Sequence, residues 1–205
     1  ECDNDPEDKD GFEDSDGCPD PDNDRDGIPD IAEGSDAEGS CMNRPETVNG
    51  LDDEDGCPDQ GRIIVSENDI NILDKIQFKT GSATILPESM KIVDTVADVL
   101  KKVPSATLIE VQGHADIRGH AGNLTLTTAR AKSVREALVQ KGIDAGRLRS
   151  MGFGDYCPVD PAKNEAAYEK NRRVEFKIVR KDGQPTGVTL GCDAATAKGI
   201  VSPPP

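Results

Sequence analysis

A carboxylate, an amide and a guanidinium follow one another at short spacing in the middle of the chain. Gly113-His114-Ala115-Asp116 ends in a carboxylate, Asn123 lies seven residues further on, and Arg130 follows after another seven. An acid and an arginine on neighbouring elements can bind a ligand that carries both an ammonium and a carboxylate, because the arginine fork bonds both carboxylate oxygens. These residue types therefore predict a binding site for a zwitterion.

Two other interpretations of these residues are open. Asp116 can be a solvated turn residue, and Arg130 a surface arginine that pairs with it. His114, Asp116 and His120 can also be read as metal ligands of a hydrolase. No Ser or Cys lies in a recognisable nucleophile motif, and no further metal ligand accompanies the histidines. We therefore expect a binding protein rather than an enzyme.

The patterns around the motif predict a mixed α/β domain over residues 62–180. Apolar and β-branched runs predict strands at 62–65, 70–73, 107–111, 148–153 and 173–179, with 76–78 continuing the second strand and Asn68-Asp69 as a turn. Helices are predicted from Pro87 to Pro104, from a cap at Thr125 or Thr127 to Gly142, and from Asn164 to Lys170. This order indicates an α+β sandwich with helices on one face of a sheet.

The charge of the chain changes at Gly61. Residues 1–61 carry 23 of the 40 acidic residues and three basic ones, a net charge of −20, whereas 62–205 carry +4. The first part would repel nucleic acid and the second would attract it only weakly, so no nucleic-acid partner is expected.

A tail over 181–205 is rich in Gly and Pro. No apolar run reaches the length of a membrane helix. The chain opens within an acidic pattern, so we expect a fragment of a longer protein.

The acidic segment repeats itself with an offset of 39 residues. Cys2-x-Asn4-x-Pro6-Glu7 recurs as Cys41-x-Asn43-x-Pro45-Glu46, and Asp14-x-Asp16-Gly17-Cys18 recurs as Asp53-x-Asp55-Gly56-Cys57. Six cysteines without a CxxC pair favour disulfides in an oxidising compartment. The simplest pairing joins Cys2 to Cys18 and Cys41 to Cys57, which leaves Cys157 for Cys192, but other pairings stay open.

Acidic residues between the repeats are spaced like the oxygen ligands of a calcium loop. Asp22, Asp24 and Asp26 fall at positions 1, 3 and 5, Gly27 permits a turn at 6, the Ile28 carbonyl falls at 7, and Glu33 at 12. Two less regular sets are Asp8, Asp10, Asp14 and Asp16, and Asn49, Asp53 and Asp55. Calcium is thus the expected cofactor. The alternative is a disordered acidic linker, because apolar residues are almost absent here.

Both parts of the chain resemble known families. The spacing of acids, Gly and Cys over 1–60 is similar to that of thrombospondin type-3 calcium repeats. The second part contains Ile76-x-Phe78, Gly113-His114-Ala115-Asp116, Asn123-x-x-Leu126-x-x-x-Arg130-Ala131, Gly142-Ile143, Arg147-Leu148, Gly152-x-Gly154 and Asn171-Arg172-Arg173-Val174-Glu175-Phe176. Over about 75–180 these motifs resemble the OmpA C-terminal family, which includes peptidoglycan-associated lipoproteins and flagellar stator B subunits. The resemblance implies a β-α-β-α-β-β sandwich that binds the diaminopimelate of the peptidoglycan stem peptide.

The resemblance also assigns roles to four residues. Asp116 is expected to bind the ammonium of the ligand and Arg130 its carboxylate. Asn123 is expected to shape the loop and hydrogen-bond the ligand, and Arg172 to supply a second cation. The chain departs from the family in two places. The spacing of fourteen from Asp116 to Arg130 is one residue shorter than the family's, and 166–173 follows the lipoprotein members and lacks an arginine of the porin-like ones.

Together these expectations describe the periplasmic part of an outer-membrane protein of a Gram-negative bacterium. A segment upstream of Glu1 would connect the chain to the outer membrane. A calcium-stiffened stalk over 1–61 would carry the domain 62–180 to the peptidoglycan. Many weak binding contacts along the polymer would together give strong attachment. The alternative is a calcium-dependent adhesion or assembly module whose acidic repeats bind a protein partner.

Overall fold

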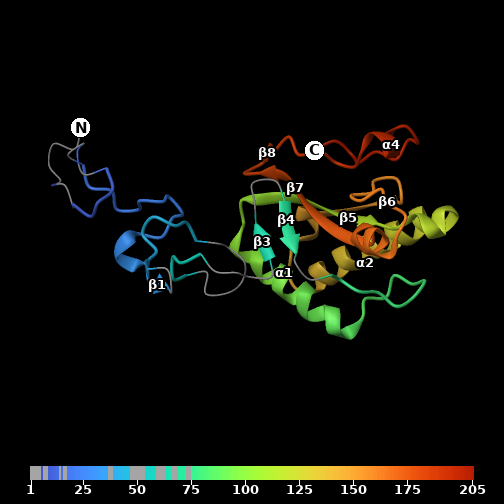
Figure 1. Cartoon of the computed structure of the whole chain (residues 1–205), viewed down its shortest axis with the longest axis horizontal. Coiled ribbons are helices and arrows are strands. Elements are labelled where there is room, and N and C mark those ends of the chain that lie inside the picture. Colours follow the sequence, from blue (N-terminus) through green and yellow to red (C-terminus); the bar gives the residue numbers. More distant parts are fainter. Residues whose placement is uncertain are drawn as a thin grey trace. The chain divides into compact units, whose positions relative to one another are not determined.

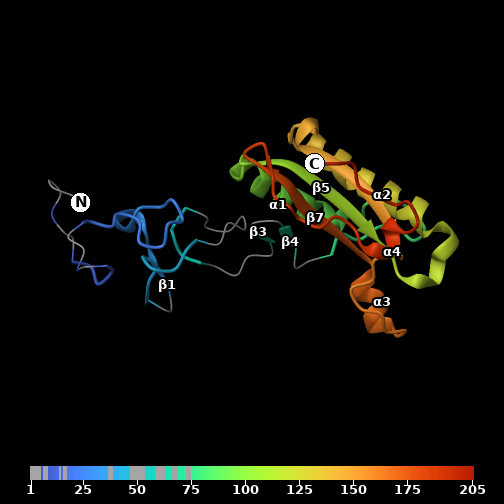
Figure 2. The same cartoon turned by 90° about the horizontal axis from the view of Figure 1, so that it is seen from above.

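A computed structural model gives the fold of the chain (Figures 1 and 2). It describes residues 6, 9–13, 15, 18–36, 39–46, 54–58, 63–65, 69–72 and 75–205. The chain divides into two compact units, Glu1–Gly61 and Arg62–Pro205. The division falls where the net charge changes sign. Within the described part of the chain, no helix has both the length and the apolar character that a membrane crossing requires.

The described part of the first unit has little regular structure. It contains the 3-10 helix η1 (Asp30–Ala32) and a short hairpin of β1 (Ser35–Asp36) and β2 (Gly39–Ser40). Cys41 and Cys57 form a disulfide, and they are the buried hydrophobic residues of the described part of this unit. Cys18 is also disulfide-bonded, and Cys2, its expected partner, lies outside the described residues. Cross-links and polar contacts therefore take the place of an apolar core here.

The second unit is built around one mixed sheet. Its strands are β3 (Ile63–Val65), β4 (Asp69–Ile72), β5 (Ala106–His114), β6 (Leu148–Gly154), β7 (Arg173–Lys181) and β8 (Gln184–Pro185). Their order is β3-β4-β7-β5-β6, with β8 beside β7. β5 and β6 run parallel, and the other pairs are antiparallel. The helices are α1 (Met90–Lys102), α2 (His120–Gln140), α3 (Glu165–Asn171) and α4 (Asp193–Thr196). This is the mixed α+β arrangement that the sequence predicts.

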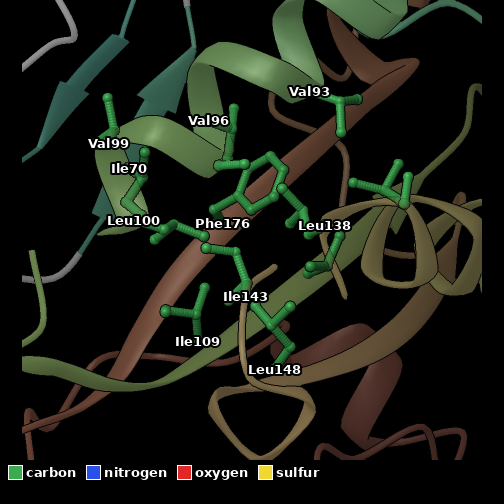
Figure 3. Close-up of a cluster of buried hydrophobic side chains, with 14 of the residues drawn as sticks. Ile70, Val93, Val96, Val99, Leu100, Ile109, Leu138, Ile143, Leu148 and Phe176 are labelled. Atoms are coloured by element: carbon green, nitrogen blue, oxygen red, sulfur yellow. The ribbon is translucent and has the colours of Figure 1, made fainter. Parts of the chain in front are cut away.

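Helices α1 and α2 cover one face of the sheet, and the apolar core lies between them and the strands (Figures 1 and 3). α1 is amphipathic. Its apolar residues recur three and four positions apart and therefore share one helix face, which packs against the sheet. The core is made of aliphatic side chains around one aromatic ring. Those labelled in Figure 3 are Ile70, Val93, Val96, Val99, Leu100, Ile109, Leu138, Ile143, Leu148 and Phe176.

Two expected boundaries are wrong. α2 begins at His120, so neither Thr125 nor Thr127 caps it. The Thr127 hydroxyl instead donates to the Asn123 carbonyl at 2.8 Å and accepts the Gly154 N–H at 3.0 Å. This hydroxyl therefore links α2 to β6 from within the helix. In the sequence, a Thr with this role cannot be told from a Thr that caps a helix. Residues 76–78 form no strand but a single bridge, from Phe78 to Ile85.

The C-terminal residues 181–205, expected as a Gly- and Pro-rich tail, are part of the second unit, and the disulfide expected between Cys157 and Cys192 is confirmed. β7 continues to Lys181, β8 pairs with it, and a disulfide joins Cys157 to Cys192. The segment then crosses the sheet face opposite α1 and α2 (Figure 1). Ala195 and Ile200 pack there against Phe153 in a second apolar cluster. The glycines of this segment with a positive φ, Gly183, Gly187, Gly191 and Gly199, therefore lie in a packed chain.

Candidate functional site

Asp116 lies in the turn that follows β5. The backbone N–H of Ala115 bonds the Gly154 carbonyl of β6 at 2.7 Å, which fixes the start of the turn. The Asp116 carboxylate accepts the backbone N–H of Arg118 at 2.9 Å and thereby caps the 3-10 helix η3 (Ile117–Gly119). The strand and the cap together orient this carboxylate.

Two arginines hold the Asp116 side chain. Arg118 donates from Nε to Oδ1 at 3.1 Å and from Nη2 to Oδ2 at 2.8 Å, and Arg172 donates to Oδ2 at 2.7 Å. Glu165, at the start of α3, bonds Arg118 at 2.9 Å and Arg172 at 3.0 Å. The hydrogen bonds from the arginines, Arg118 foremost, hold the pKa of Asp116 well below its usual value although burial opposes the shift. The site thus contains a firmly ionised carboxylate.

Arg130 and Arg172 line one cavity of about 340 Å³ at the end of β5. The Arg130 Nε donates to the Ser82 carbonyl at 3.1 Å, and its guanidinium lies 4.9 Å from the centre of the Phe78 ring. Burial lowers the pKa of Arg130. The charged residues of the cavity wall are Lys75, Arg130, Arg172, Arg173 and Glu169. Four cations against one acid make this cavity suited to an anionic group.

Asn123 holds the loop between Asp116 and α2. Its amide nitrogen donates to the Asp116 carbonyl at 2.7 Å and to Asp155 at 3.1 Å, and the side chain is buried. His120 contacts the other oxygen of Asp155 at 2.7 Å. The loop-shaping role expected of Asn123 thus has a concrete form, because its amide fixes the backbone from which the Asp116 side chain projects.

Two glycines on neighbouring strands bring α2 close to the sheet. Gly113 of β5 is paired in register with Gly152 of β6. A Cβ on either residue would overlap the α2 backbone, at Thr127 above Gly113 and at Thr128 above Gly152. Only glycine permits this approach. It places Arg130, one turn further along the helix, at the cavity beside the strand end.

His114 is buried within the domain and belongs to no group of potential metal ligands among the described residues. It is 4% exposed, its ring stacks on Phe153, and neither ring nitrogen has a hydrogen-bond partner among the described residues. Burial, and secondarily the charge of Arg173, lower its pKa to about 3, so the imidazole is neutral. His120 bonds Asp155 instead of joining His114 and Asp116. The hydrolase interpretation therefore finds no support in the described residues.

The expected site residues are brought together, but with different contacts. Asp116 pairs with Arg118 and Arg172, and within the described residues it forms no ion pair with Arg130. Arg118 and Glu165 were not predicted to belong to the site. Arg118 follows the Asp by two residues, a spacing that allows a side chain to fold back onto the cap. Glu165 carries no comparable sequence signal, since only the tertiary fold brings α3 to this loop.

Acidic side chains of the first unit form a second cluster. Asp22, Asp24 and Asp26 each offer a carboxylate oxygen, and these oxygens all lie within 4.8 Å of one another. The same carboxylates also accept backbone N–H groups of the loop. Asp22 accepts the Gly27 N–H at 3.1 Å, Asp24 accepts the Asp26 N–H at 3.2 Å, and Asp26 accepts the Ile28 N–H at 2.7 Å. Gly27 has a φ of +96°, the left-handed turn expected of it.

Several oxygens of this cluster are buried without a partner. Oδ1 of Asp22, Oδ2 of Asp24, Oδ2 of Asp30 and both carboxylate oxygens of Glu33 have no hydrogen-bond partner among the described residues. Burial, and then the charges of neighbouring carboxylates such as Asp24, raise the pKa of Glu33 to about 7. Buried, unpaired carboxylate oxygens are costly unless a cation neutralises them. The donor set, carboxylates only, is the one that suits a hard cation.

The other residues expected to bind metal are placed less fully. Asp10 accepts the Phe12 N–H at 2.9 Å and an N–H of the Asn23 amide at 2.7 Å. Asp55 accepts the Cys57 N–H at 2.9 Å. Both therefore form local turns. Five further expected ligands lie outside the described residues: Asp8, Asp14, Asp16, Asn49 and Asp53.

Residues 77–172, which lie within the second unit, match the model of the OmpA family. The chain is 36% identical over 110 residues to the probable lipoprotein YiaD of Escherichia coli strain K12, a match that covers 53% of this chain and 50% of the relative. It is 34% identical over 105 residues to the peptidoglycan-associated lipoprotein of Rhizobium meliloti strain 1021, covering 51% and 59%. The chain thus spans about half to three fifths of the length of these relatives.

A solved structure is similar as well. The cell wall anchor of the T6SS from Pseudomonas aeruginosa superposes with a TM-score of 0.51 and 28% sequence identity, covering 58% of this chain and 89% of that one. The family match falls on the unit that carries Asp116 and Arg130. The first unit lies outside the range of the family match.

Proposed function

We propose that the OmpA-like domain binds peptidoglycan non-covalently through the diaminopimelate of the stem peptide. The observation that carries the proposal is the pairing of an ionised, buried carboxylate with a cationic cavity at the end of β5. Diaminopimelate offers an ammonium and a carboxylate on one carbon. The relatives support the ligand class, since they include a peptidoglycan-associated lipoprotein and a cell wall anchor.

Each site residue has a defined part in this proposal. Asp116 receives the ammonium, and Arg130 and Arg172 receive the carboxylate in the cavity that both line. Asn123 holds the loop through the Asp116 carbonyl. A guanidinium presented over an aromatic ring, as Arg130 is over Phe78, keeps its fork in one plane and loses little freedom when a carboxylate binds.

This activity would place the chain on the periplasmic side of the outer membrane, as part of an attachment between membrane and cell wall. The names of the relatives, lipoproteins among them, support that location. A single site need not bind tightly, because many copies of the protein face a polymer with many identical stem peptides.

Sedimentation with isolated peptidoglycan sacculi tests the binding site. Asp116→Ala and Arg130→Ala are each expected to weaken binding by about tenfold or more, the value of a charge-assisted hydrogen bond. Asp98→Ala and Lys132→Ala are matched controls, since both residues are exposed and form surface ion pairs on α1 and α2. If the two site variants sediment as fully as the wild type, the assignment is wrong.

We further propose that the first unit binds calcium in the loop 22–33. The buried oxygens of Asp22, Asp24 and Glu33 that lack partners support this proposal. Asp26 and the Ile28 carbonyl would complete the expected set, and Asp30 offers a further free oxygen that the loop pattern alone did not select. Bound cations would offset part of the −20 charge and stiffen the segment.

Calorimetry of the full chain with calcium tests this second proposal. Binding should be lost on addition of chelator, and residues 1–61 should then become protease-sensitive while 62–205 stay resistant. Unchanged proteolysis of 1–61 after chelation, or no heat of binding, would show that the acidic cluster binds no calcium. Magnesium at equal concentration is the control for charge alone, because it prefers a smaller octahedral site.

A further inference from the structure

The Asp116 carboxylate has no free acceptor position in this structure. Oδ1 accepts the backbone N–H and the Nε–H of Arg118, and Oδ2 accepts the Nη2–H of Arg118 and an N–H of Arg172. An ionised carboxylate offers about four acceptor positions, and these four bonds fill them. Only 9% of the Asp116 side chain is exposed. An incoming ammonium must therefore displace one of the present donors.

The backbone donor and Arg172 are poorly placed to leave. The Arg118 N–H is fixed by the cap of η3, since moving it would unwind the turn. Arg172 already faces the cavity that receives the ligand carboxylate, and its side chain is 36% exposed. Arg172 can therefore contact Asp116 and an anion at the same time.

The Arg118 side chain can leave more easily. It is 51% exposed, and it also contacts Glu165 at 2.9 Å and lies 4.5 Å from the centre of the Tyr168 ring. Glu165 is 67% exposed and belongs to another element, α3. When the guanidinium leaves Asp116, the carboxylate of Glu165 and the ring face of Tyr168 still stabilise it.

We propose that the Arg118 side chain is an internal competitor of the ligand, which occupies the ammonium position on Asp116 and moves onto Glu165 and Tyr168 when the ligand binds. This proposal rests on the proposed function and adds a mechanism of selection. A ligand with an ammonium replaces one cation by another, so the buried carboxylate stays neutralised. A ligand without an ammonium leaves Arg118 in place and gains nothing from Asp116.

Titration of the full chain with two probes tests this proposal. The probes are meso-diaminopimelate and pimelate, which has the same seven-carbon dicarboxylate chain without the amino groups. Arg118→Ala is expected to bind diaminopimelate about three- to fivefold more tightly than the wild type, the upper range for a partly exposed ion pair. Its affinity for pimelate should not rise. Lys132→Ala, which removes an exposed cation of α2, should leave both affinities unchanged.

The outcomes separate this proposal from the proposed function. If Arg118→Ala binds diaminopimelate as well as or more weakly than the wild type, Arg118 is a structural residue and the competitor mechanism is wrong. A gain for pimelate equal to that for diaminopimelate would also overturn it, because competition at Asp116 requires an ammonium. If neither the wild type nor Arg118→Ala binds diaminopimelate, both proposals fail. Thermal unfolding of Arg118→Ala, expected near that of the wild type, shows that the variant is folded.

Discussion

His114 should make the second unit sensitive to mild acid. The ring is buried among side chains of the sheet face opposite α1 and α2, where Arg173, Glu175 and Lys177 of β7 face it and Phe153 of β6 stacks on it. Its pKa is lowered from 6.5 to about 3, mainly by burial. Below pH 6.5 the unfolded chain therefore binds a proton that the folded chain does not, and stability is lost as the pH falls from 6.5 towards 3.

The size of the loss follows from the pKa difference. Each pH unit below 6.5 costs about 1.4 kcal/mol, so the folded state should lose about 2 kcal/mol between pH 7 and pH 5 because of this one residue. Ordinary carboxylates, with an unperturbed pKa of about 4, contribute little in this window. Glu33, whose pKa is raised to about 7, contributes equally in the wild type and in a His114 variant, so the difference between the two isolates the histidine.

Urea unfolding followed by circular dichroism at pH 7 and pH 5 measures the effect. His114→Gln cannot be protonated, so its loss of stability between the two pH values should be smaller than that of the wild type by about 2 kcal/mol. His120→Gln is the matched control, since His120 is exposed beside Asp155. If His114→Gln and the wild type lose equal stability between pH 7 and pH 5, the folded protein accepts a proton on His114 and the reasoning is refuted.

Three further predictions concern packing, the disulfide and the acidic loop. Gly152→Ala should cost about 1–3 kcal/mol in urea unfolding because its Cβ would overlap the α2 backbone, whereas Gly122→Ala, on the open side of α2, should not destabilise the fold. Loss of the Cys157–Cys192 disulfide, which closes a loop of 35 residues, should cost about 4 kcal/mol and expose 182–205 to protease. Asp24→Asn should weaken calcium binding at least about tenfold in calorimetry, and Asp98→Asn should leave it unchanged.

The fold class and the identity of the main site residues could be predicted because both depend on local patterns. Helical spacing predicts α1, alternation predicts β5 and β7, and the turn after β5 carries Asp116. The start of α2 was mispredicted because a Thr inside a helix that bonds a backbone carbonyl has the same sequence appearance as a cap. The segment at Ile76 looks like a strand from its apolar alternation, but it pairs through one bridge only.

The contacts within the site could not be predicted from sequence spacing. The bond between Arg172 and Asp116 joins residues 56 positions apart, and that between Arg118 and Glu165 joins residues 47 positions apart. The residue types predict that Asp116 lies close to an arginine, but they do not predict which arginine forms the ion pair. The difference matters, because Asp116 is occupied by Arg118 and not by Arg130. The sequence predicts that the Asp116 carboxylate is open to an ammonium. In the structure the Arg118 side chain occupies that carboxylate.

The C-terminal segment supports this site from the opposite face of the sheet. Glu110 of β5 is fully buried there, and its carboxylate is satisfied by Gln112 at 2.7 Å, Arg149 at 2.8 Å and the Ser202 hydroxyl at 2.7 Å. The same segment packs on Phe153.

Without this segment, Glu110 would lose the Ser202 bond and Phe153 would lose its cover. Phe153 stacks on His114, and His114 forms part of the cavity wall beside Arg130. A chain that ends at residue 180, the domain boundary predicted from the sequence, should therefore bind diaminopimelate more weakly even though every residue assigned to the ligand is present.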